Sequence, residues 1–269
     1  MSLRPKFREE QVVAIESFIA HHLRESGRKG LVIGMSGGLD SSVVAKLCTV
    51  AVGARKVLGL MLYDDLTSPS DRKDARGLAK SLKISFRELN IAPMIDAFRR
   101  TLRIEPRQRV ALGNIKARCR MIVLYGIAGL ESRLVIGTSN KSELLTGYFT
   151  KAGDGMADFA PLGDLYKTQV KEMARFLDIP SDILEKPPTA SLWKGQTDER
   201  DLGISYSDLD RVLLGFELQL DADDISRKTG LSPAKVSLVE RLIGQSVHKR
   251  KMPLIPKMGI RTLGLDWRE

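Results

Sequence analysis

The clearest chemical signal is the stretch Ser-Gly-Gly-Leu-Asp-Ser-Ser at positions 36–42. Its two adjacent glycines let the backbone approach a ligand without a Cβ in the way. The three serine hydroxyls can donate hydrogen bonds, and Asp40 offers the carboxylate oxygen that a phosphate-bound Mg²⁺ usually requires. This combination predicts a site for a polyphosphate and its magnesium ion.

The segments on either side show how this stretch would be held. Leu31 to Met35 is an apolar run typical of a buried strand, and Val43 to Leu47 continues as a helix. The first N–H groups of a helix lack internal partners and lie at the positive end of its dipole, so a phosphate can bind there. The Gly-x-x-x-x-Gly-Lys spacing of a Walker loop is absent. An ordinary strand-to-helix turn with a serine cap is the alternative interpretation.

Strands and helices alternate along the first 180 residues. Further strands are predicted over 56–63, 84–89 and 133–137, and helices over 7–24, 71–82, 91–102, 107–129 and 166–177, with Ser70 as a candidate cap. This alternation predicts an α/β fold with a doubly wound, mostly parallel sheet flanked by helices. Ligands of such sheets bind at the carboxyl ends of the strands, where positions 36–42 would lie.

A single domain is expected for 269 residues, with a helical C-terminal part. Residues 30–180 would form the nucleotide-binding core, 186–202 a flexible polar lid loop and 206–250 the C-terminal helices. Positions 225–236 mimic a DNA-binding helix-turn-helix, with Gly230 in the turn and a basic second helix. Two packed helices that close a core would give the same pattern, and we favour that interpretation.

Charge and composition narrow the classes of partner. The chain has 43 Lys and Arg against 33 Asp and Glu, a net charge of +10, which favours anionic partners such as nucleic acid or polyphosphate nucleotides. The longest nearly apolar run, Met121 to Leu130, is too short to span a bilayer, and the N-terminus lacks the pattern of a signal peptide. We therefore expect a cytoplasmic protein without a membrane partner.

Two more segments contain candidate site residues. The turn at 138–143 follows a predicted strand, and Glu143 could complete a Mg²⁺ shell with Asp40; a first-turn acid favoured by the helix dipole is the alternative. The glycine-rich segment 146–158 has two aromatics, a lysine and two aspartates without periodicity, which is typical of a functional loop. In the predicted helix 107–129, Lys116, Arg118 and Arg120 alternate with apolar residues, and a solvated position is the simple interpretation of each.

The stretch at 36–41 resembles the pyrophosphate loop of the ATP pyrophosphatases, which activate a carbonyl or carboxyl oxygen as an adenylate. Cys48 and Cys119 lie far apart and no Cys-x-x-Cys occurs, which argues against the relatives that thiolate transfer RNA. Together with eight later stretches, the loop makes the chain similar to the ammonia-dependent NAD synthetases, in order and over nearly the whole length. Those stretches are Asn114-Ile-Lys-Ala-Arg118, Gly137-Thr138, Glu143, Gly147-Tyr-Phe-Thr-Lys151, Gly153-Asp-Gly155, Lys186-Pro-Pro-Thr-Ala190, Gly203-Ile-Ser-Tyr206 and His248-Lys-Arg250.

The resemblance implies amidation of deamido-NAD to NAD with ammonia, through an adenylate formed from ATP with release of pyrophosphate and AMP. It implies Mg²⁺ held by Asp40 and Glu143, and catalytic roles for Asp40 and Lys167. The implied ATP-binding residues are Gly34, Met35, Ser36, Gly37, Gly38, Leu39, Asp40, Ser41, Thr138, Lys167 and Thr189. The implied deamido-NAD-binding residues are Arg118, Lys151, Asp158, His248 and Lys249.

The resemblance also implies a homodimer with the dinucleotide site between subunits, and the apolar positions 121–130 are a candidate contact. One departure is the turn at 138–143, which has Asn140 where many bacterial members have histidine. Another adenylating amidotransferase of the same superfamily, for example one acting on a purine nucleotide, is the enzymatic alternative, although the segment 147–151 argues against it. A nucleic-acid-binding protein is the other alternative, which we do not favour.

Overall fold

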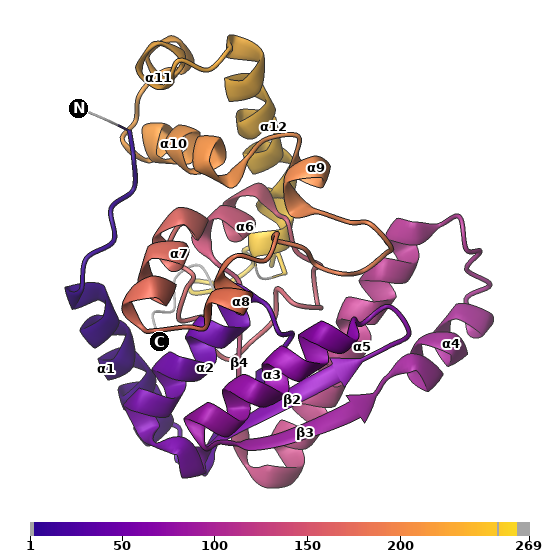
Figure 1. Ribbon diagram of the computed structural model, residues 1–269. Coiled ribbons are helices and arrows are strands. Elements are labelled where there is room, and N and C mark those ends of the chain that lie inside the picture. The colour runs from indigo at the N-terminus through magenta and orange to yellow at the C-terminus, as the bar shows by residue number, and fades with distance from the viewer. Residues whose placement is uncertain (1–2, 252, 263–269) are drawn as a thin grey trace.

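A four-stranded parallel sheet forms the centre of the computed structural model, which describes residues 3–251 and 253–262 (Figure 1). The strand order is β3-β2-β1-β4, so the chain reverses its direction of winding between β1 and β4. Ile33 of β1 aligns with Gly59 of β2 on one side and with Ile136 of β4 on the other. In chain order the elements are α1 (Glu10–Glu25), β1 (Gly30–Gly34), α2 (Leu39–Val52), η1 (Ala54–Lys56), β2 (Val57–Tyr63), α3 (Pro69–Leu82), β3 (Ser85–Asn90), α4 (Ala92–Thr101), α5 (Arg109–Glu131), β4 (Arg133–Ile136), α6 (Lys141–Thr146), α7 (Lys167–Phe176), α8 (Ser181–Leu184), α9 (Asp198–Leu202), α10 (Tyr206–Glu217), α11 (Ala222–Thr229) and α12 (Pro233–Arg250).

Helices cover both faces of the sheet, and successive residues of a strand point to opposite faces. Leu31 and Ile33 join a core made with α1, α2, α3 and α7, whereas Val32 between them joins a second core made with α4 and α5. The two central strands therefore read as continuous apolar runs. This arrangement confirms the predicted doubly wound α/β fold, and it places the carboxyl ends of β1 and β4 beside each other.

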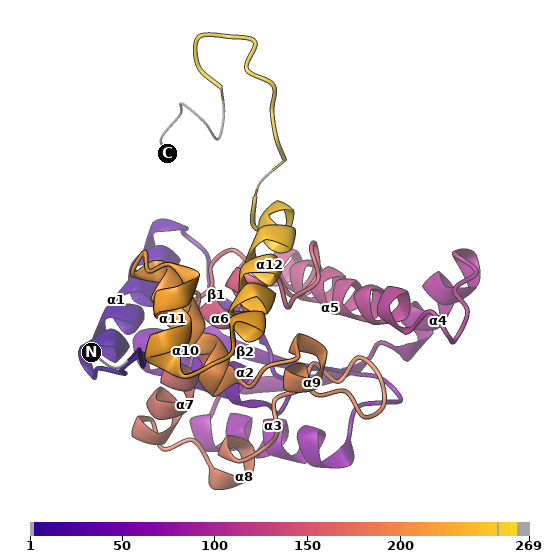
Figure 2. The ribbon, with the colours of Figure 1, turned by 90° about the horizontal axis from the view of Figure 1, so that it is seen from above.

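The C-terminal helices form a third core. Ile225 of α11 and Val236 and Val239 of α12 are fully buried against α10, so the two helices that mimic a helix-turn-helix pack together around apolar side chains. The helices α10, α11 and α12 lie above the sheet in Figure 1, and Figure 2 shows residues 253–262 running away from the end of α12. No helix among the described residues is long and apolar enough to cross a membrane.

Local details differ from the predictions at the start of α3 and at the end of segment 186–202. Ser68, and not Ser70, caps α3, because Pro69 fits the first helical position and the Ser68 hydroxyl accepts a hydrogen bond from Asp71 N at 3.0 Å. The predicted loop 186–202 is not loop to its end. Its last five residues form the short helix α9, which Gly203 ends with a positive φ of 73°.

Lys116 is buried rather than solvated. Its ammonium lies 2.8 Å from Asp64 Oδ2, and the two side chains are only 7% and 3% exposed. Asp64 follows β2, and its other oxygen accepts hydrogen bonds from Leu66 N and the Thr67 hydroxyl. Burial alone would raise the pKa of Asp64, but Lys116, the Arg120 charge and Thr67 together hold it below its ordinary value. The pair joins α5 to the end of β2.

Replacing Lys116 with methionine is expected to lower the free energy of unfolding by about 3 to 5 kcal/mol, because Asp64 then stays buried without its partner. Since the pKa of Asp64 is depressed, the contribution of the pair is present above the unfolded value of about 4 and is lost as the pH falls below it. Denaturant titration at neutral and acidic pH measures both effects, with Lys80→Met as the exposed control. A loss below about 1 kcal/mol at neutral pH would contradict this prediction.

Candidate functional site

The loop between β1 and α2 packs against neighbouring backbone at Gly37. This residue has a φ of 78°, and a Cβ there would lie 2.3 Å from the Asp71 carbonyl oxygen, so only glycine fits. Gly38 is the N-cap residue of α2, and the Met35 N–H donates to the Leu60 carbonyl at 2.9 Å. The loop is therefore fixed between β2 and the start of α3, with the first N–H groups of α2 at the sheet edge.

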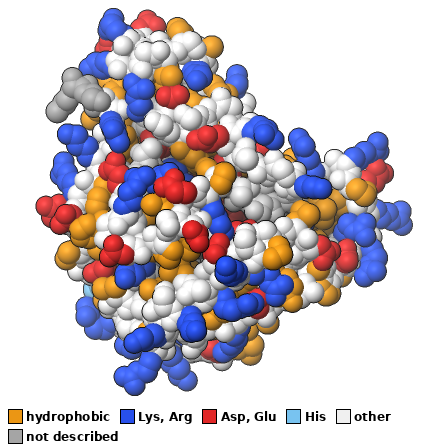
Figure 3. Space-filling view, viewed as in Figure 1, with side chains coloured by type: hydrophobic (Ala, Val, Ile, Leu, Met, Phe, Trp, Pro, Cys, Tyr) orange, Lys and Arg blue, Asp and Glu red, His pale blue; other side chains and the backbone are white. Residues whose placement is uncertain are grey.

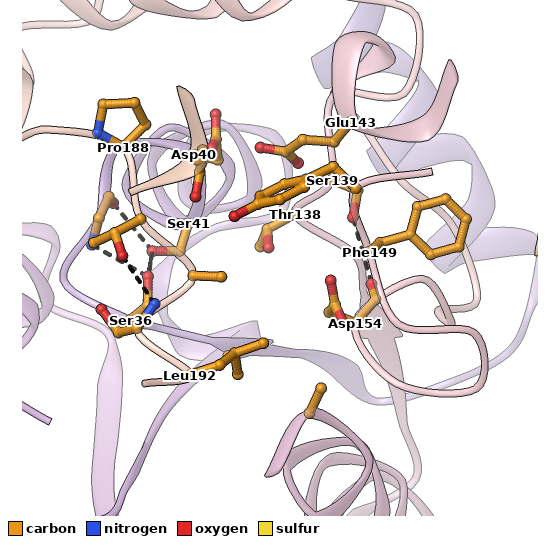
Figure 4. Close-up of a pocket in the computed structure, with 18 of the residues that line it drawn as sticks. Ser36, Asp40, Ser41, Thr138, Ser139, Glu143, Phe149, Asp154, Pro188 and Leu192 are labelled. Atoms are coloured by element: carbon orange, nitrogen blue, oxygen red, sulfur yellow. Dashed lines mark hydrogen bonds between the residues drawn. The ribbon is translucent and has the colours of Figure 1, made fainter. Parts of the chain in front are cut away.

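Serine hydroxyls hold the shape of this loop from inside. The Ser41 hydroxyl accepts a hydrogen bond from Ser36 N at 3.3 Å and donates to the Gly38 carbonyl at 3.1 Å. The Ser36 hydroxyl in turn accepts from Gly38 N at 3.2 Å (Figure 4). Ser42 also donates to Gly38 O, at 2.7 Å. These internal hydrogen bonds fix the shape of the loop that is predicted to bind phosphate.

A cluster of opposite charges lies next to this loop. The Lys167 ammonium contacts Asp40 Oδ2 and lies 3.6 Å from Glu143 Oε1, and all three side chains are largely buried. Asp198 is a third carboxylate of this cluster, and its charge also raises the pKa of Lys167. The ring of Tyr206 lies 5.4 Å from the Lys167 nitrogen, and the Tyr206 hydroxyl donates to Asp198 at 3.2 Å. Residues from α2, α6, α7, α9 and α10 therefore meet at one lysine.

The pKa values of this cluster follow from burial and from mutual charge. Burial raises the pKa of Glu143, and the neighbouring Asp40 raises it further, while Lys167 opposes both. Burial alone would lower the pKa of Lys167, but the charges of Asp40 and Glu143 raise it above its ordinary value. Lys167 therefore stays charged, whereas Glu143 takes up a proton more readily than an ordinary glutamate.

The residues fit a divalent cation. Asp40 Oδ1 is buried and has no hydrogen-bond partner within the described part of the chain, and Asp40 and Glu143 point toward the same space in Figure 4. Among the described residues, no group of three or more His, Cys, Asp or Glu could hold a metal ion. Two carboxylates suit Mg²⁺, which is usually bound by one or two carboxylates together with substrate phosphates and water.

The cluster and the loop line one cavity of about 640 Å³, a size typical of small-molecule sites. In Figure 3 it opens as a hollow between the C-terminal helices and the arm formed by α4 and the start of α5, on which Lys and Arg side chains gather. Leu192 and Trp193 of segment 186–202 pack over Gly113 of α5, where a Cβ would lie 3.1 Å from Leu192 Cβ. Segment 186–202 thus forms one wall of the cavity.

Lys186 fixes the start of that wall. Its ammonium lies 2.6 Å from Asp71 and 2.5 Å from Asp74 of α3, and it donates to the Gly37 carbonyl at 3.2 Å. Burial alone would lower the pKa of Lys186, but these two carboxylates raise it. The segment is therefore joined to the loop at Gly37 and to α3 at the same point.

Most residues assigned to ATP and Mg²⁺ line this cavity. The exception is Gly37, which packs against the Asp71 backbone of α3 instead. Those that line the cavity are Gly34, Met35, Ser36, Gly38, Leu39, Asp40, Ser41, Thr138, Glu143, Lys167 and Thr189. These residues come from distant segments and line one cavity; their binding of ATP and Mg²⁺ stays a prediction.

The residues assigned to deamido-NAD divide differently. Lys249 lines the cavity and donates to the carbonyls of Gly147 and Phe149 at 2.7 and 2.9 Å. Arg118, Lys151 and His248 form a chain outside it: Arg118 donates to the Lys151 carbonyl at 3.2 Å, and the Lys151 ammonium donates to the His248 carbonyl at 2.9 Å.

Asp158 also lies outside the cavity. Its carboxylate accepts a hydrogen bond from Val135 N of β4 at 2.6 Å. The structure therefore does not bring Arg118, Lys151, Asp158 and His248 to the cavity that holds Asp40 and Lys167.

Several lining residues were given no role from the sequence, although Lys186 and Tyr206 lay in recognised stretches. Asp198 is only 4% exposed, and no local pattern marks a buried acid in a polar segment. Its signal is spatial, since the Tyr206 hydroxyl that donates to it belongs to another helix. Arg120 also lines the cavity, and it donates to the Leu62 carbonyl at 3.4 Å.

A doubly wound sheet with a glycine-serine loop at its switch point, an adjacent acidic pair and a buried lysine defines a phosphate-binding α/β protein. The family model described as NAD synthase matches residues 11–253. The chain is 47% identical over 249 residues to the NH(3)-dependent NAD(+) synthetase of Thermococcus kodakarensis, covering 91% of this chain and 96% of that protein. The chain belongs to the NAD synthase family.

Solved structures agree with this membership. An NMN synthetase from Francisella tularensis superposes with a TM-score of 0.83 at 36% identity, covering 94% of this chain and all of that one (100%). An NH3-dependent NAD synthetase from Campylobacter jejuni, in complex with the nitrate ion, superposes with a TM-score of 0.79 at 30% identity, covering 93% and 98%. The similarity thus extends over nearly the whole of each chain.

Proposed function

We propose that the protein converts deamido-NAD to NAD by ATP-dependent amidation with ammonia. The observation that supports this most directly is the Asp40–Lys167–Glu143 cluster beside the serine-fixed loop, in a chain of the NAD synthase family. A carboxylate is a poor electrophile, so its oxygen first attacks the α-phosphorus of ATP. Pyrophosphate leaves and a mixed anhydride forms. Ammonia then attacks the activated carbonyl carbon, AMP leaves, and the lost proton passes to solvent.

Each part of the cluster has a defined task in this proposal. The loop at 34–41 and Thr138 bind the ATP phosphates, and Thr189 contacts ATP from segment 186–202, which acts as the lid. Asp40 and Glu143 hold Mg²⁺, which would neutralise phosphate charge. Lys167 places its fixed positive charge at the phosphate where negative charge develops. Closure of the lid would keep water from the adenylate.

We propose that deamido-NAD binds across a homodimer. Arg118, Lys151, Asp158 and His248 lie outside the ATP cavity. They could therefore contact a dinucleotide only where it extends out of this cavity along the protein surface, or where it is bound by a second subunit. The neighbouring face of α5 exposes Ile122, Tyr125 and Leu130, the last at 84%. Sedimentation of a dimer would support this assignment, and a fully active monomer would contradict it. We place the reaction in the cytoplasm.

Amidation of nicotinate mononucleotide is the second candidate. The structure from Francisella tularensis, which covers 94% of this chain at 36% identity, is an NMN synthetase. The same adenylate chemistry would act on the shorter substrate. The 47% identical relative from Thermococcus kodakarensis, an NAD(+) synthetase, favours the dinucleotide.

The test supplies purified protein with ATP, Mg²⁺ and ammonium, and with either deamido-NAD or nicotinate mononucleotide as acceptor. NAD, AMP and pyrophosphate in equal amounts from deamido-NAD support the proposal, and product from the mononucleotide alone supports the second candidate. Excess EDTA should stop product formation, and added Mg²⁺ should restore it. Parallel samples with glutamine in place of ammonium identify the nitrogen donor, and activity with glutamine alone would contradict the proposal.

A further inference from the structure

Asp210 of α10 is a completely buried carboxylate to which the proposed reaction assigns no part. It accepts hydrogen bonds from three donors. Ser142 Oγ of α6 donates to Oδ1 at 2.5 Å, whereas Thr168 N and Thr168 Oγ1 of α7 donate to Oδ2 at 2.8 and 2.7 Å. A single carboxylate therefore joins three helices that are far apart in the sequence.

Ser142 extends this contact to the backbone of the catalytic lysine. Its hydroxyl accepts a hydrogen bond from Lys167 N at 2.9 Å while it donates to Asp210. The first two N–H groups of α7, at Lys167 and Thr168, are thus bound by Ser142 and Asp210, and a negative charge lies where the positive end of the α7 dipole favours it. The start of α7 cannot rotate or slide without breaking these bonds.

The partners of Asp210 are the sequence neighbours of the charged site residues. Ser142 immediately precedes Glu143, and Thr168 immediately follows Lys167. Tyr206, four residues before Asp210 on the same face of α10, places its ring 5.4 Å from the Lys167 nitrogen. Any change in the spacing of α6 and α7 at Asp210 would therefore change the spacing of Glu143 and Lys167 within the cavity.

We propose that Asp210 is a positioning residue, which fixes Lys167 relative to Asp40 and Glu143 by binding Ser142 and Thr168. It does not touch substrate, and it acts through the first turn of α7. The inference rests on the proposed amidation for its kinetic readout. The C-terminal helices therefore contribute to catalysis through geometry as well as through packing.

The variants separate positioning from stability. Asp210→Asn keeps the shape but replaces one acceptor oxygen with a donor, and Ser142→Ala removes only the hydroxyl that joins Lys167 N to Asp210. The matched control is Asp221→Ala, because Asp221 caps α11 in the same set of helices, accepting from Asp224 N at 2.7 Å, and lies outside the cavity. Each of the three substitutions alters a side chain that accepts a hydrogen bond from a backbone N–H in the first turn of a helix. That helix is α7 for Asp210 and Ser142, and α11 for Asp221.

At a temperature where each variant is folded, kcat for NAD formation should fall by about 10- to 100-fold in Asp210→Asn, because a displacement of about 1 Å at a reacting centre has effects of this size. The kcat of Ser142→Ala should also fall. The KM for deamido-NAD should change by less than about threefold in both variants. Asp221→Ala should lower the melting temperature and leave kcat unchanged. If Asp210→Asn does not fold, Ser142→Ala gives the decisive result.

A double-variant cycle identifies Lys167 as the route. In a Lys167→Ala background, measured by single-turnover AMP formation, Asp210→Asn should add little further loss. Additive losses would overturn the proposal, as would a folded Asp210→Asn enzyme with wild-type kcat. Calorimetric titration with MgATP should show at least about fivefold weaker binding by Asp210→Asn, whichever acceptor the wild type uses. Failure of the wild type to make NAD would contradict the proposed function instead, and unchanged MgATP affinity would then still overturn this inference.

Discussion

An Asp40→Ala variant is expected to lose about 10³-fold or more in kcat for NAD formation, the largest effect predicted for any single change in this chain. Asp40 holds the Lys167 ammonium through Oδ2, and its buried Oδ1, which has no hydrogen-bond partner among the described residues, is the oxygen that we propose binds Mg²⁺. In this proposal its removal takes away a metal ligand and also one of the two carboxylates that hold the lysine. The free energy of unfolding should change by less than about 2 kcal/mol, because Lys167 keeps Glu143 as a partner.

Steady-state kinetics with saturating Mg²⁺ and ATP, together with denaturant titration, measure both effects for Asp40. Asp208→Asn is the matched control, because Asp208 is also an acid in the first turn of a helix, α10, but lies outside the cavity. Its kcat should stay within about twofold of wild type. An Asp40→Ala enzyme that forms NAD at the wild-type rate would show that the metal role assigned to Asp40 is wrong.

Replacing Lys167 with methionine should lower kcat by about 10²- to 10³-fold, because the charge at the reacting phosphate is lost. This variant should also be less stable, by about 2 to 4 kcal/mol, since Asp40, Glu143 and Asp198 stay together in a buried site without their shared cation. The carboxylates would then take up protons, so the loss of stability should be smaller at acidic pH. Kinetics and denaturant titration at two pH values measure these effects.

The control for Lys167 is Lys141→Met. Lys141 also holds two carboxylates, Asp164 at 3.0 Å and Glu217 at 2.8 Å, but it lies outside the cavity. Its variant should lose stability and keep kcat within about threefold of wild type. If both variants retained activity equally, the assignment of Lys167 to the reacting phosphate would be wrong.

The sheet and its loop could be predicted because their signals are local. A continuous apolar run such as Leu31 to Ile33 marks a strand buried on both faces, and the glycines and serines that follow mark a helix start that can bind an anion. The position of Glu143 beside the loop could be predicted for the same reason, since it lies in the turn and helix that follow the carboxyl end of β4. Residues in the first turns after a strand can therefore be placed at the sheet edge from the sequence alone.

The rest of the site depends on packing between distant segments. Lys116 was interpreted as a solvated residue, but Asp64 from another element makes its burial possible. Ser142 and Asp210 showed no pattern either, because their hydrogen bonds span 68 residues. Lys116 and Arg120 are four residues apart and share a face of α5, whereas Arg118 between them lies on another side. Sequence spacing does not reveal that the shared face is the one that meets Asp64 and the end of β2.

Because the site is assembled from distant segments, the order of synthesis decides which of its contacts a nascent chain can form. Arg133 of β4 bonds to Leu31 of β1 across 102 residues, and Lys167 reaches Asp40 across 127. A nascent chain that ends before α10 has the loop and the central strands but lacks Asp210, the carboxylate that binds both Ser142 of α6 and Thr168 of α7. Contacts of such separation form slowly, because closing a long loop costs entropy before any contact forms. Nucleotide binding should therefore be one of the last properties that a newly made chain acquires.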